Sequence, residues 1–526
     1  MPDTYNLVDH FVDRHIREGR GQKPAIVSDG RTLSYAQVAE QVGRVGNGLL
    51  RLGVQQEQRV MLLLPDSPEF VAAYFGTMKI GAVAVPASTA LRAADYSYFL
   101  AESRARVLIV HSSLYAEVSS VLQGPRHLRH VVVCGEPIEG CLHWDSWLFS
   151  SSPDLDAEPT HRDDVAFWLW TSGSTGRPKA AVHLHHDWVY CCESYGNILK
   201  IDSRDITFSS SKLHHAYGLG NGLMFPFHVG AMTILFPGRS QAKVILELVQ
   251  ARRPTLFFSV PTLYAAMLQE TDRASYDLSS VRLGVSAAEP LPSEIFRRWT
   301  ERFGFEILDG IGSTEVLHIY LSASPGRVRP GSTGKAVPGY ELQIVDSDGK
   351  QVSAGTIGDL LVKGSSTAQC YWNHHQLSSD RMRGEWFFTG DKYWMDEDGY
   401  FWYAGRADDM FRVSGQWVSP NEVEGALVAH SSVLEAAVVA YEEDTQLHTP
   451  KAFVVLKEGF IGSPALVSEL QEFVKQRITP YKYPRRIEFL PDLPKTAAGK
   501  VLRYKLRQSS IAGLIPGSSP RQVGSD

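Results

Sequence analysis

The sequence predicts an α/β protein of at least two domains, the larger of which contains helix-covered, mostly parallel β-sheets. Two observations support this fold class. The chain has 526 residues, which is more than a single hydrophobic core usually holds, and its N-terminal part alternates helical and strand patterns. Its apolar fraction of 44% and charged fraction of 21% are typical of globular proteins, so disordered and fibrous classes are excluded.

A helix with a clear N-terminal signal opens the first repeated unit. Ser34 and Gln37 fit a capping box, in which each side chain bonds the backbone N–H of the other residue. Apolar residues then recur at steps of three and four, which places them on one helical face. They are Val38, Val42, Val45, Leu49 and Leu52.

Strand and helix patterns alternate after this helix. The apolar run Val60–Leu64 predicts a buried strand, Pro68–Lys79 a helix and Ala82–Val85 a further strand. More strands are predicted at Val107–Val110, His130–Cys134, Phe167–Trp170 and Thr255–Val260. Repetition of a strand–helix unit implies a parallel sheet covered by helices.

A smaller C-terminal domain is predicted from its own helix and strand patterns. The division falls near Arg406–Asp409, so that residues 1–407 form the N-terminal domain and residues 408–526 the C-terminal one. The patterns lie at Glu435–Ala440, Ala452–Leu456 and Leu466–Val474. From about Ser509 the chain is rich in Ser, Gly and Pro, which indicates a loose tail.

Charge, hydropathy and cysteine content exclude several classes of function. The formal net charge of -6 argues against a protein that wraps nucleic acid through a basic surface. No run of about 18 apolar residues and no signal-peptide pattern occurs, so we expect a cytoplasmic protein without a membrane partner. The five cysteines show no spacing typical of zinc or redox sites.

The strongest local signal lies directly after the predicted strand that ends at Trp170. There the sequence reads Thr-Ser-Gly-Ser-Thr-Gly-Arg-Pro-Lys from Thr171 to Lys179. Glycine lets the backbone approach a phosphate closely, hydroxyls and N–H groups donate to its oxygens, and the basic residues add positive charge. The loop lacks the glycine spacing of a Walker A motif, and a flexible Gly/Ser connector rarely follows a buried strand. The candidate phosphate ligands are Thr171, Ser172, Gly173, Ser174, Thr175, Gly176 and Lys179.

This loop and four further segments resemble the superfamily of acyl-adenylate-forming, ATP-dependent AMP-binding enzymes. The segments are Gly312–Glu315, Thr389–Asp391, Gly405–Gly415 and Pro494–Lys500. Each of them is short enough to occur by chance, and Thr-Gly-Asp alone is most often a turn. Together with the loop they follow the order of the family over nearly the whole chain, which makes a chance match negligible.

The resemblance implies how ATP and Mg²⁺ are bound. Thr314 would contact a phosphate, and Glu315 would help to hold the Mg²⁺ ion. Asp391 and Arg406 would bind the ribose hydroxyls. Further nucleotide contacts would come from Asp309, Gly310 and Ile311. Positive charge is needed because a carboxylate attacks the α-phosphorus of ATP, and two like charges about 4 Å apart repel by about 4 kcal/mol in a protein environment.

The resemblance also implies a β-rich subdomain in the large domain and a small, mobile α+β C-terminal domain. That domain would carry the catalytic Lys500 and rotate about the hinge residue Asp408 between two half-reactions. A solvated linker charge is the alternative interpretation of Asp408. The Lys500 loop also resembles a site of reversible lysine acetylation in related ligases, and acetylation would remove the positive charge.

Within the superfamily the chain resembles the benzoate–CoA ligase branch. The resemblance lies in Lys212–Gly222 and Thr314–Ile319, and it implies a flat slot for an aromatic ring, with His318 near the carboxylate. The residues of this slot would be Ala216, Tyr217, Gly312, His318 and Ile319. The glycines of residues 218–222 alone would be a poor signal for dinucleotide binding.

The chain departs from this branch at two places. It has His214-His215 where an aromatic pair is usual, and Lys179-Ala180 where Lys-Gly is usual. We hypothesise that His215 hydrogen-bonds a polar ring substituent, such as an amino or hydroxyl group. The alternative is a neutral His215 ring that is satisfied by a neighbouring residue.

The activity expected from this resemblance is that of an ATP-dependent aryl-CoA ligase. It would convert benzoate, or an amino- or hydroxybenzoate, to its CoA thioester through an aryl-adenylate, with ATP, Mg²⁺ and coenzyme A taking part. Two alternatives stay open: loading of an acyl carrier protein, which would use the same motifs, and a nucleotide-binding sensor without turnover. The presence of Lys500, Asp391 and Glu315 together disfavours the sensor. A homodimer is also left open.

Overall fold

A computed structural model describes residues 1–171, 177–271, 275–407, 409–413, 416–442, 448–495, 501–503 and 505–507. Contacts between residues divide the chain into two compact units. The large unit contains residues 1–343, 361–389 and 399–401, and the small unit contains residues 344–360, 390–398 and 402–526. The domain boundary between residues 407 and 408 stays a prediction, and Asp408 itself lies outside the described residues.

The first sheet of the large unit has eight strands in the order β19-β9-β8-β4-β3-β5-β6-β7. Strands β8 to β7 of this order pair in parallel, whereas β9 is antiparallel to both β8 and β19. The strands are β3 (Arg59–Leu63), β4 (Val83–Pro86), β5 (Val107–His111), β6 (His130–Cys134), β7 (Leu142–His143), β8 (Val165–Thr171), β9 (Lys179–Leu184) and β19 (Cys370–Tyr371). The predicted parallel pairing of the first strands is confirmed.

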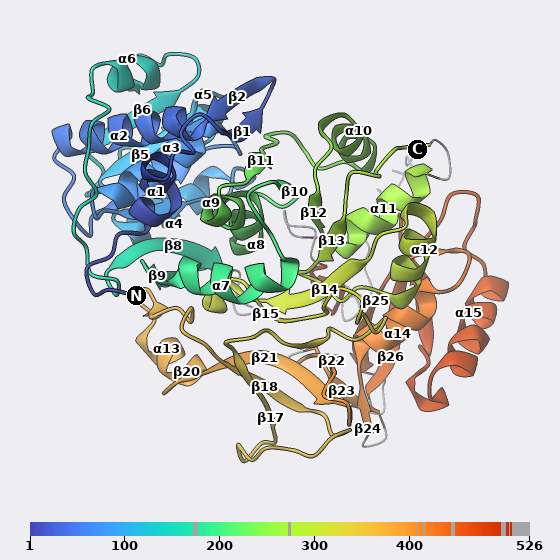
Figure 1. Cartoon of the computed structure of the whole chain (residues 1–526). Coiled ribbons are helices and arrows are strands. Elements are labelled where there is room, and N and C mark those ends of the chain that lie inside the picture. Colours follow the sequence, from blue (N-terminus) through green and yellow to red (C-terminus); the bar gives the residue numbers. More distant parts are fainter. Residues whose placement is uncertain are drawn as a thin grey trace, which may run out of the picture. The chain divides into compact units, whose positions relative to one another are not determined.

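The helices of this region are α2 (Tyr35–Arg51), α3 (Pro68–Lys79), α4 (Ala93–Ser103), α5 (Ser112–Ser119) and α6 (Trp144–Phe149). Helices α3 to α6 contact strands of this sheet, as the repeated unit predicted, and α2 packs on α3 and α6 (Figure 1). Ser34 and Gln37 form the predicted capping box at the start of α2. Helices α2 and α3 lie very close together, because a Cβ atom added at Gly76 would come within 2.6 Å of the Val45 side chain. The chain enters this region through a short π-helix, η1 (Asp9–Asp13), and α1 (Arg14–Arg17).

The second sheet of the large unit has nine strands in the order β16-β15-β14-β13-β12-β10-β11-β1-β2. Its central strands, from β1 to β14, are parallel, and antiparallel strands flank them at both edges. The strands are β1 (Pro24–Ser28), β2 (Arg31–Ser34), β10 (Ile206–Ser209), β11 (Met232–Ile234), β12 (Leu256–Ser259), β13 (Leu283–Ser286), β14 (Ile307–Gly312), β15 (Ile319–Ser322) and β16 (Lys335–Ala336).

The segments that accompany this second sheet are helical. They are α7 (Asp187–Leu199), α8 (Ala216–Leu219), the π-helix η2 (Gly220–Met224), α9 (Phe225–Val229), α10 (Ala242–Arg252), α11 (Pro261–Thr271) and α12 (Ser293–Phe303). Helices α10, α11 and α12 share one apolar core with the sheet, centred on buried residues such as Phe257, Tyr264 and Trp299. This core supports the carboxyl ends of β12, β13 and β14, where ligands bind in open parallel sheets.

A β-rich region follows, as predicted. Its five strands have the order β17-β18-β21-β20, with β22 beside β21. The elements are β17 (Glu341–Val345), β18 (Gly358–Lys363), α13 (His375–Arg381), β20 (Met382–Arg383), β21 (Trp386–Met395) and β22 (Phe401–Arg406).

The C-terminal part of the small unit has an α+β core of its own, which confirms the prediction of a separate domain core. Strand β26 pairs antiparallel with β25 and parallel with β27. Helices α14 and α15 share an apolar core with this sheet, in which Val438, Val454 and Leu470 are buried. The elements are β23 (Phe411–Val413), β24 (Gln416–Val418), α14 (Pro420–Val428), β25 (Val433–Glu442), β26 (His448–Leu456), α15 (Pro464–Arg477), the 3-10 helix η4 (Pro480–Lys482) and β27 (Arg486–Phe489). The predicted tail from Ser509 lies outside the described residues.

Within the described part of the chain, every helix is too short or too polar to cross a lipid bilayer.

Candidate active site

The predicted phosphate-binding loop joins two antiparallel strands of the first sheet. Thr171 is the last residue of β8 and Lys179 the first residue of β9, and the two are paired across the strands. The Arg177 guanidinium lies over the Tyr98 ring, 5.2 Å from its centroid, and the Tyr98 hydroxyl donates to the carbonyl of Pro178 at 3.0 Å. Both ends of the loop are therefore fixed. Ser172, Gly173, Ser174, Thr175 and Gly176 lie outside the described residues.

A tight turn after β14 carries the predicted Thr314 and Glu315. Thr314–Val316 form a 3-10 helix, η3, and Ser313 caps it by accepting the N–H of Val316 at 3.2 Å. The turn ends at Leu317, whose φ of 73° is left-handed and strained for a residue with a side chain. Strand β8 packs against η3, so the strand that ends at Thr171 and the Thr314 turn are neighbours in the large unit.

Other parts of the large unit hold the Glu315 side chain and backbone in place. The hydroxyl of Tyr371 donates to Oε1 of Glu315 at 2.7 Å, and the N–H of Ala368 donates to the Glu315 carbonyl at 2.7 Å. The glutamate is half-buried. Its carboxylate is thus oriented before any ligand binds.

Asp309 is buried on β14, the strand that leads into the turn of Thr314. Its exposed fraction is 7%, and its Oδ1 makes no hydrogen bond of normal geometry within the described residues. Burial raises the pKa of this carboxyl group to about 8. A buried polar atom without a partner is uncommon in native proteins, so Asp309 is well suited to bind a polar group of a ligand. Gly310 and Ile311 follow it on the same strand.

The predicted ribose-binding residues meet in the small unit. Nη1 of Arg406 lies 3.0 Å from Oδ1 of Asp391, and Asp391 is buried. Asp391 belongs to β21 and Arg406 ends the neighbouring strand β22. An aspartate and an arginine side by side on neighbouring strands can bind adjacent hydroxyls of a sugar. The carboxylate accepts a hydrogen bond from a hydroxyl, and the guanidinium donates one.

The residues predicted for the aryl slot lie in α8, at the end of β14 and at the start of β15. The rings of Tyr217 and His318 are stacked, with centroids 5.8 Å apart and an interplanar angle of 28°. Gly312 is paired with Ile319 across β14 and β15. A Cβ atom at Gly312 would lie 2.5 Å from the His318 carbonyl oxygen, so only glycine fits there. Ala216 is buried, whereas Gly312 is open to solvent.

His318 is the centre of this aromatic cluster. Its ring contacts Trp188, Tyr195 and Phe225 as well as Tyr217. Burial lowers the pKa of His318 to about 3, so the ring is neutral. Neither ring nitrogen makes a hydrogen bond of normal geometry within the described residues. An apolar, aromatic-lined site with a few polar atoms is typical of a small-molecule pocket.

The His214-His215 pair lies beside the slot residue Ala216. The two rings are in contact, with centroids 4.2 Å apart. Burial lowers the pKa of both residues, that of His215 to about 4, so the rings are neutral. The His215 side chain is half-buried and makes no hydrogen bond to the described part of the chain. The hypothesis that it binds a ring substituent stays a prediction.

Several residues of this region were not foreseen from the sequence. His183, Asp187, Ser366 and Tyr371 all contact the Thr314 turn or one another. They come from segments far apart in the chain, so no local motif marked them. The predicted Lys500 and Asp408 lie outside the described residues.

Comparisons with known proteins cover nearly the whole chain and agree with the resemblance seen in its motifs. The family model for "AMP-binding enzyme" matches residues 12–372, and that for "AMP-binding enzyme C-terminal domain" matches residues 422–500. The chain is 44% identical to the benzoate–CoA ligase of Thauera aromatica over 97% of each protein. It is 42% identical to the 4-hydroxybenzoate–CoA/benzoate–CoA ligase of Rhodopseudomonas palustris over 97% of this chain and 95% of that protein.

Solved structures agree with these relatives. An anthranilate CoA ligase in complex with anthranoyl-AMP superposes with a TM-score of 0.94 at 43% identity, covering 98% of each chain. A benzoate CoA ligase from Burkholderia xenovorans LB400 superposes with a TM-score of 0.89 at 42% identity, covering 96% of this chain and 100% of the other. The chain therefore belongs to the family of AMP-binding enzymes and, within it, to the branch of the benzoate–CoA ligases.

Proposed function

We propose that the chain is an ATP-dependent aryl-CoA ligase. It activates benzoate, or an amino- or hydroxybenzoate, as an aryl-adenylate and transfers the aryl group to coenzyme A. One observation carries this proposal. The aryl slot and the predicted phosphate-binding residues are neighbours in the sequence, at the end of β14 and in the turn that follows it. Gly312 lines the slot with Tyr217 and His318, and Thr314 and Glu315 follow it within three residues. An aryl acid in the slot would therefore present its carboxylate to phosphates held at the turn.

The first half-reaction is the attack of a carboxylate oxygen on the α-phosphorus of ATP, with pyrophosphate as the leaving group. The phosphate loop and Thr314 would hold the phosphates, and Asp391 and Arg406 the ribose. Lys500 would stabilise the charge that develops on the phosphoryl oxygens. In this scheme the residues act by positioning and electrostatics, which contribute most of the catalysis in phosphoryl transfer.

Glu315 is the candidate ligand of the magnesium ion that accompanies ATP. A half-buried carboxylate, oriented by Tyr371, is a suitable donor because Mg²⁺ in nucleotide sites takes one or two carboxylates and completes its shell with phosphates and water. The described residues contain no cluster of three or more His, Cys, Asp or Glu side chains that could hold a metal ion, and such a nucleotide site needs none. The ion supplies positive charge at the phosphates when it is bound.

The second half-reaction is the attack of the CoA thiol on the carbonyl carbon of the aryl-adenylate, with AMP as the leaving group. Lys500 is needed at the nucleotide in the first step only. We infer that the C-terminal domain rotates about Asp408 between the steps, so that the thiol reaches the adenylate after Lys500 has left.

A substituent on the ring is proposed to lie near His215. The relatives named for 4-hydroxybenzoate and anthranilate act on acids with a hydroxyl or an amino group. The neutral His215 ring has one nitrogen that donates and one that accepts, so it can bond either group. The preference among benzoate, 2-aminobenzoate and the hydroxybenzoates would follow from this contact.

The proposal is tested by measuring pyrophosphate release with a panel of aryl acids, for the parent enzyme and for His215→Phe. The parent should release pyrophosphate only with an aryl acid present and should form the CoA thioester when CoA is added. His215→Phe should lose activity on the substituted acids by about 10-fold relative to benzoate, because one hydrogen bond is lost. An unchanged order of preference among the acids would show that His215 does not bind the ring substituent. Thioester formation on an acyl carrier protein but not on CoA would favour the alternative acceptor.

A further inference from the structure

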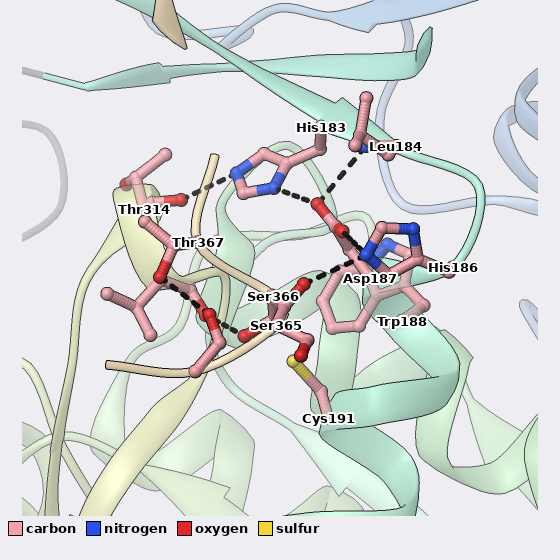
Figure 2. Close-up of polar contacts among 12 residues, drawn as sticks. His183, Leu184, His186, Asp187, Trp188, Cys191, Thr314, Ser365, Ser366 and Thr367 are labelled. Carbon is pink, nitrogen blue, oxygen red and sulfur yellow. Dashed lines mark hydrogen bonds and ion pairs between the residues drawn. The ribbon is translucent and has the colours of Figure 1, made fainter. Parts of the chain in front are cut away.

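A buried histidine and aspartate stand at the junction of β9 and α7. Nδ1 of His183 lies 2.7 Å from Oδ2 of Asp187, and both side chains have an exposed fraction of 0%. The same Asp187 oxygen accepts the N–H of Leu184 at 3.1 Å. Figure 2 shows this pair with the contacts around it. The carboxylate thus fixes the orientation of the imidazole ring, as a carboxylate does for a catalytic or metal-bound histidine.

The other ring nitrogen of His183 reaches the turn that carries Thr314 and Glu315. Nε2 lies 2.8 Å from the carbonyl oxygen of Thr314 (Figure 2). A carbonyl oxygen only accepts hydrogen bonds, so Nε2 donates. His183 lies 131 residues from Thr314 in the sequence, so this contact joins two distant segments of the chain.

Three consecutive carbonyl groups of the turn are held from outside. His183 donates to the carbonyl of Thr314, the N–H of Ala368 to that of Glu315 at 2.7 Å, and the hydroxyl of Ser366 to that of Val316 at 2.8 Å. The turn ends in the left-handed Leu317, a conformation that persists only where surrounding contacts enforce it. The orientation of Thr314 and Glu315 therefore depends on these external contacts.

Asp187 also lies next to a second histidine on the same side of the turn. Nε2 of His186 is 3.2 Å from Oδ1 of Asp187 and 2.9 Å from the carbonyl oxygen of Ser365. Ser365 precedes Ser366, which holds the carbonyl of Val316. One buried carboxylate therefore lies between the histidine that holds Thr314 and the histidine that holds the Ser365–Ser366 segment (Figure 2).

We propose that His183, oriented by Asp187, is a positioning residue for the adenylation half-reaction. It connects β9, the strand that begins at Lys179 of the phosphate loop, to the turn of Thr314 and Glu315. Its contact with the Thr314 carbonyl fixes the distance between these two phosphate-binding elements. The fully buried ring does not itself contact ATP or the acid. This inference rests on the proposed roles of Thr314 and Glu315.

Two amide substitutions of His183 distinguish a positioning role from a general effect on stability. Each amide can replace one of the two ring nitrogens. His183→Asn places its amide near the position of Nδ1, so it can contact Asp187 but not Thr314. His183→Gln is longer by one methylene and can place an amide N–H near the position of Nε2. His185→Gln is the matched control, because His185 is equally buried and its Nδ1 accepts the N–H of Leu7 instead of contacting the turn.

Each protein is assayed in three ways: pyrophosphate release with benzoate, thioester formation from preformed benzoyl-AMP and CoA, and calorimetric binding of ATP with and without Mg²⁺. For His183→Asn we expect adenylation to fall by about 10- to 100-fold, with weaker binding of ATP in the presence of Mg²⁺ and a KM for benzoate within about threefold of the parent. Thioester formation should stay close to that of the parent. His183→Gln should recover part of the lost adenylation, and His185→Gln should behave as the parent.

Parent-like adenylation and Mg²⁺-dependent ATP binding in His183→Asn would overturn the inference, and so would an equal loss in both half-reactions. If His183→Asn does not fold, Asp187→Asn takes its place, since it keeps the size of the side chain and removes the carboxylate; the same split between half-reactions is expected. A parent protein that makes no aryl-CoA at all would refute the proposed function instead. The two failures are therefore distinguishable.

Discussion

Asp309 illustrates how burial at one residue sets a property that the sequence alone does not reveal. The sequence marks it as a candidate nucleotide contact, and the fold adds that its carboxyl group is buried with one oxygen lacking a partner within the described residues. Burial raises its pKa to about 8. The group is thus protonated at neutral pH in the free protein, and it can donate as well as accept a hydrogen bond.

The raised pKa of Asp309 predicts a pH-dependent cost to stability. The pKa of Asp309 is about 8 in the folded protein, whereas a solvated aspartate has a pKa of 3.8. The folded state therefore binds one proton more than the unfolded state between these two pH values. The contribution of this group to the free energy of unfolding has its full value below pH 3.8. It decreases as the pH rises toward 8, by up to about 1.4 kcal/mol per pH unit. Asp309→Asn removes this slope.

The urea midpoints of the parent and Asp309→Asn, measured from pH 5 to 8 by circular dichroism, check this prediction. The variant should gain stability relative to the parent as the pH rises. Curves that stay parallel over this range would show that Asp309 ionises as readily in the folded protein as in the unfolded chain.

At the scale of elements, local patterns were sufficient for the helices and strands that carry a clear apolar periodicity or cap. Helix α3 and strand β6 have the predicted bounds, and helix α2 begins at the predicted capping box. Their signals are periodicity and caps, which act over a few residues. Two-residue strands such as β7 and β19 and the π-helix η2 were not predicted, because tertiary pairing rather than local sequence creates them.

The site was predictable to a different degree. The resemblance to a known superfamily pointed to Thr314, Glu315 and the slot residues, and the fold brings Tyr217, Gly312, His318 and Ile319 together. The His183–Asp187 pair could not be predicted, since its function as a contact depends on a partner 131 residues away in the sequence. Positioning contacts of this kind follow from the three-dimensional fold.

The C-terminal loop that contains Lys500 carries a prediction of its own. Lys500→Ala should lower the rate of benzoate-dependent pyrophosphate release by about 100-fold or more, because a preorganised positive charge at the developing phosphoryl charge is removed. Thioester formation from preformed benzoyl-AMP and CoA should persist, since Lys500 is not needed at that step. Single-turnover assays of each half-reaction measure both effects. An equal decrease in the rates of both half-reactions would contradict the claim that Lys500 acts in adenylation only.

At the scale of the whole molecule, the large unit holds a set of neutral histidines that are buried or half-buried. Burial lowers the pKa of each of them. They are His10, His15, His185, His214, His215, His228 and His318. Six of these pKa values lie at about 3 to 4, whereas the ordinary pKa of histidine is about 6.5. The folded protein therefore binds fewer protons than the unfolded chain in this range.

These histidines predict that the large unit is labile in mild acid. Their contribution to stability is complete above pH 6.5 and is lost as pH falls toward 4, by up to about 1.4 kcal/mol per pH unit for each histidine. The sign is opposite to that of Asp309, and the larger number of histidines should dominate. Unfolding free energies measured in urea at steps between pH 7 and 5 should decrease steeply. A constant or rising stability over this range would contradict the neutral state of these rings.

The central claim is that the acid is activated by transfer of one carboxylate oxygen to the α-phosphorus of ATP. Benzoate labelled with ¹⁸O in both carboxylate oxygens tests it directly, with mass spectrometry of the products after turnover with ATP and CoA. The account predicts AMP that carries one ¹⁸O atom for each benzoyl-CoA formed, with unlabelled pyrophosphate. ADP with labelled inorganic phosphate, or AMP without label, would contradict it.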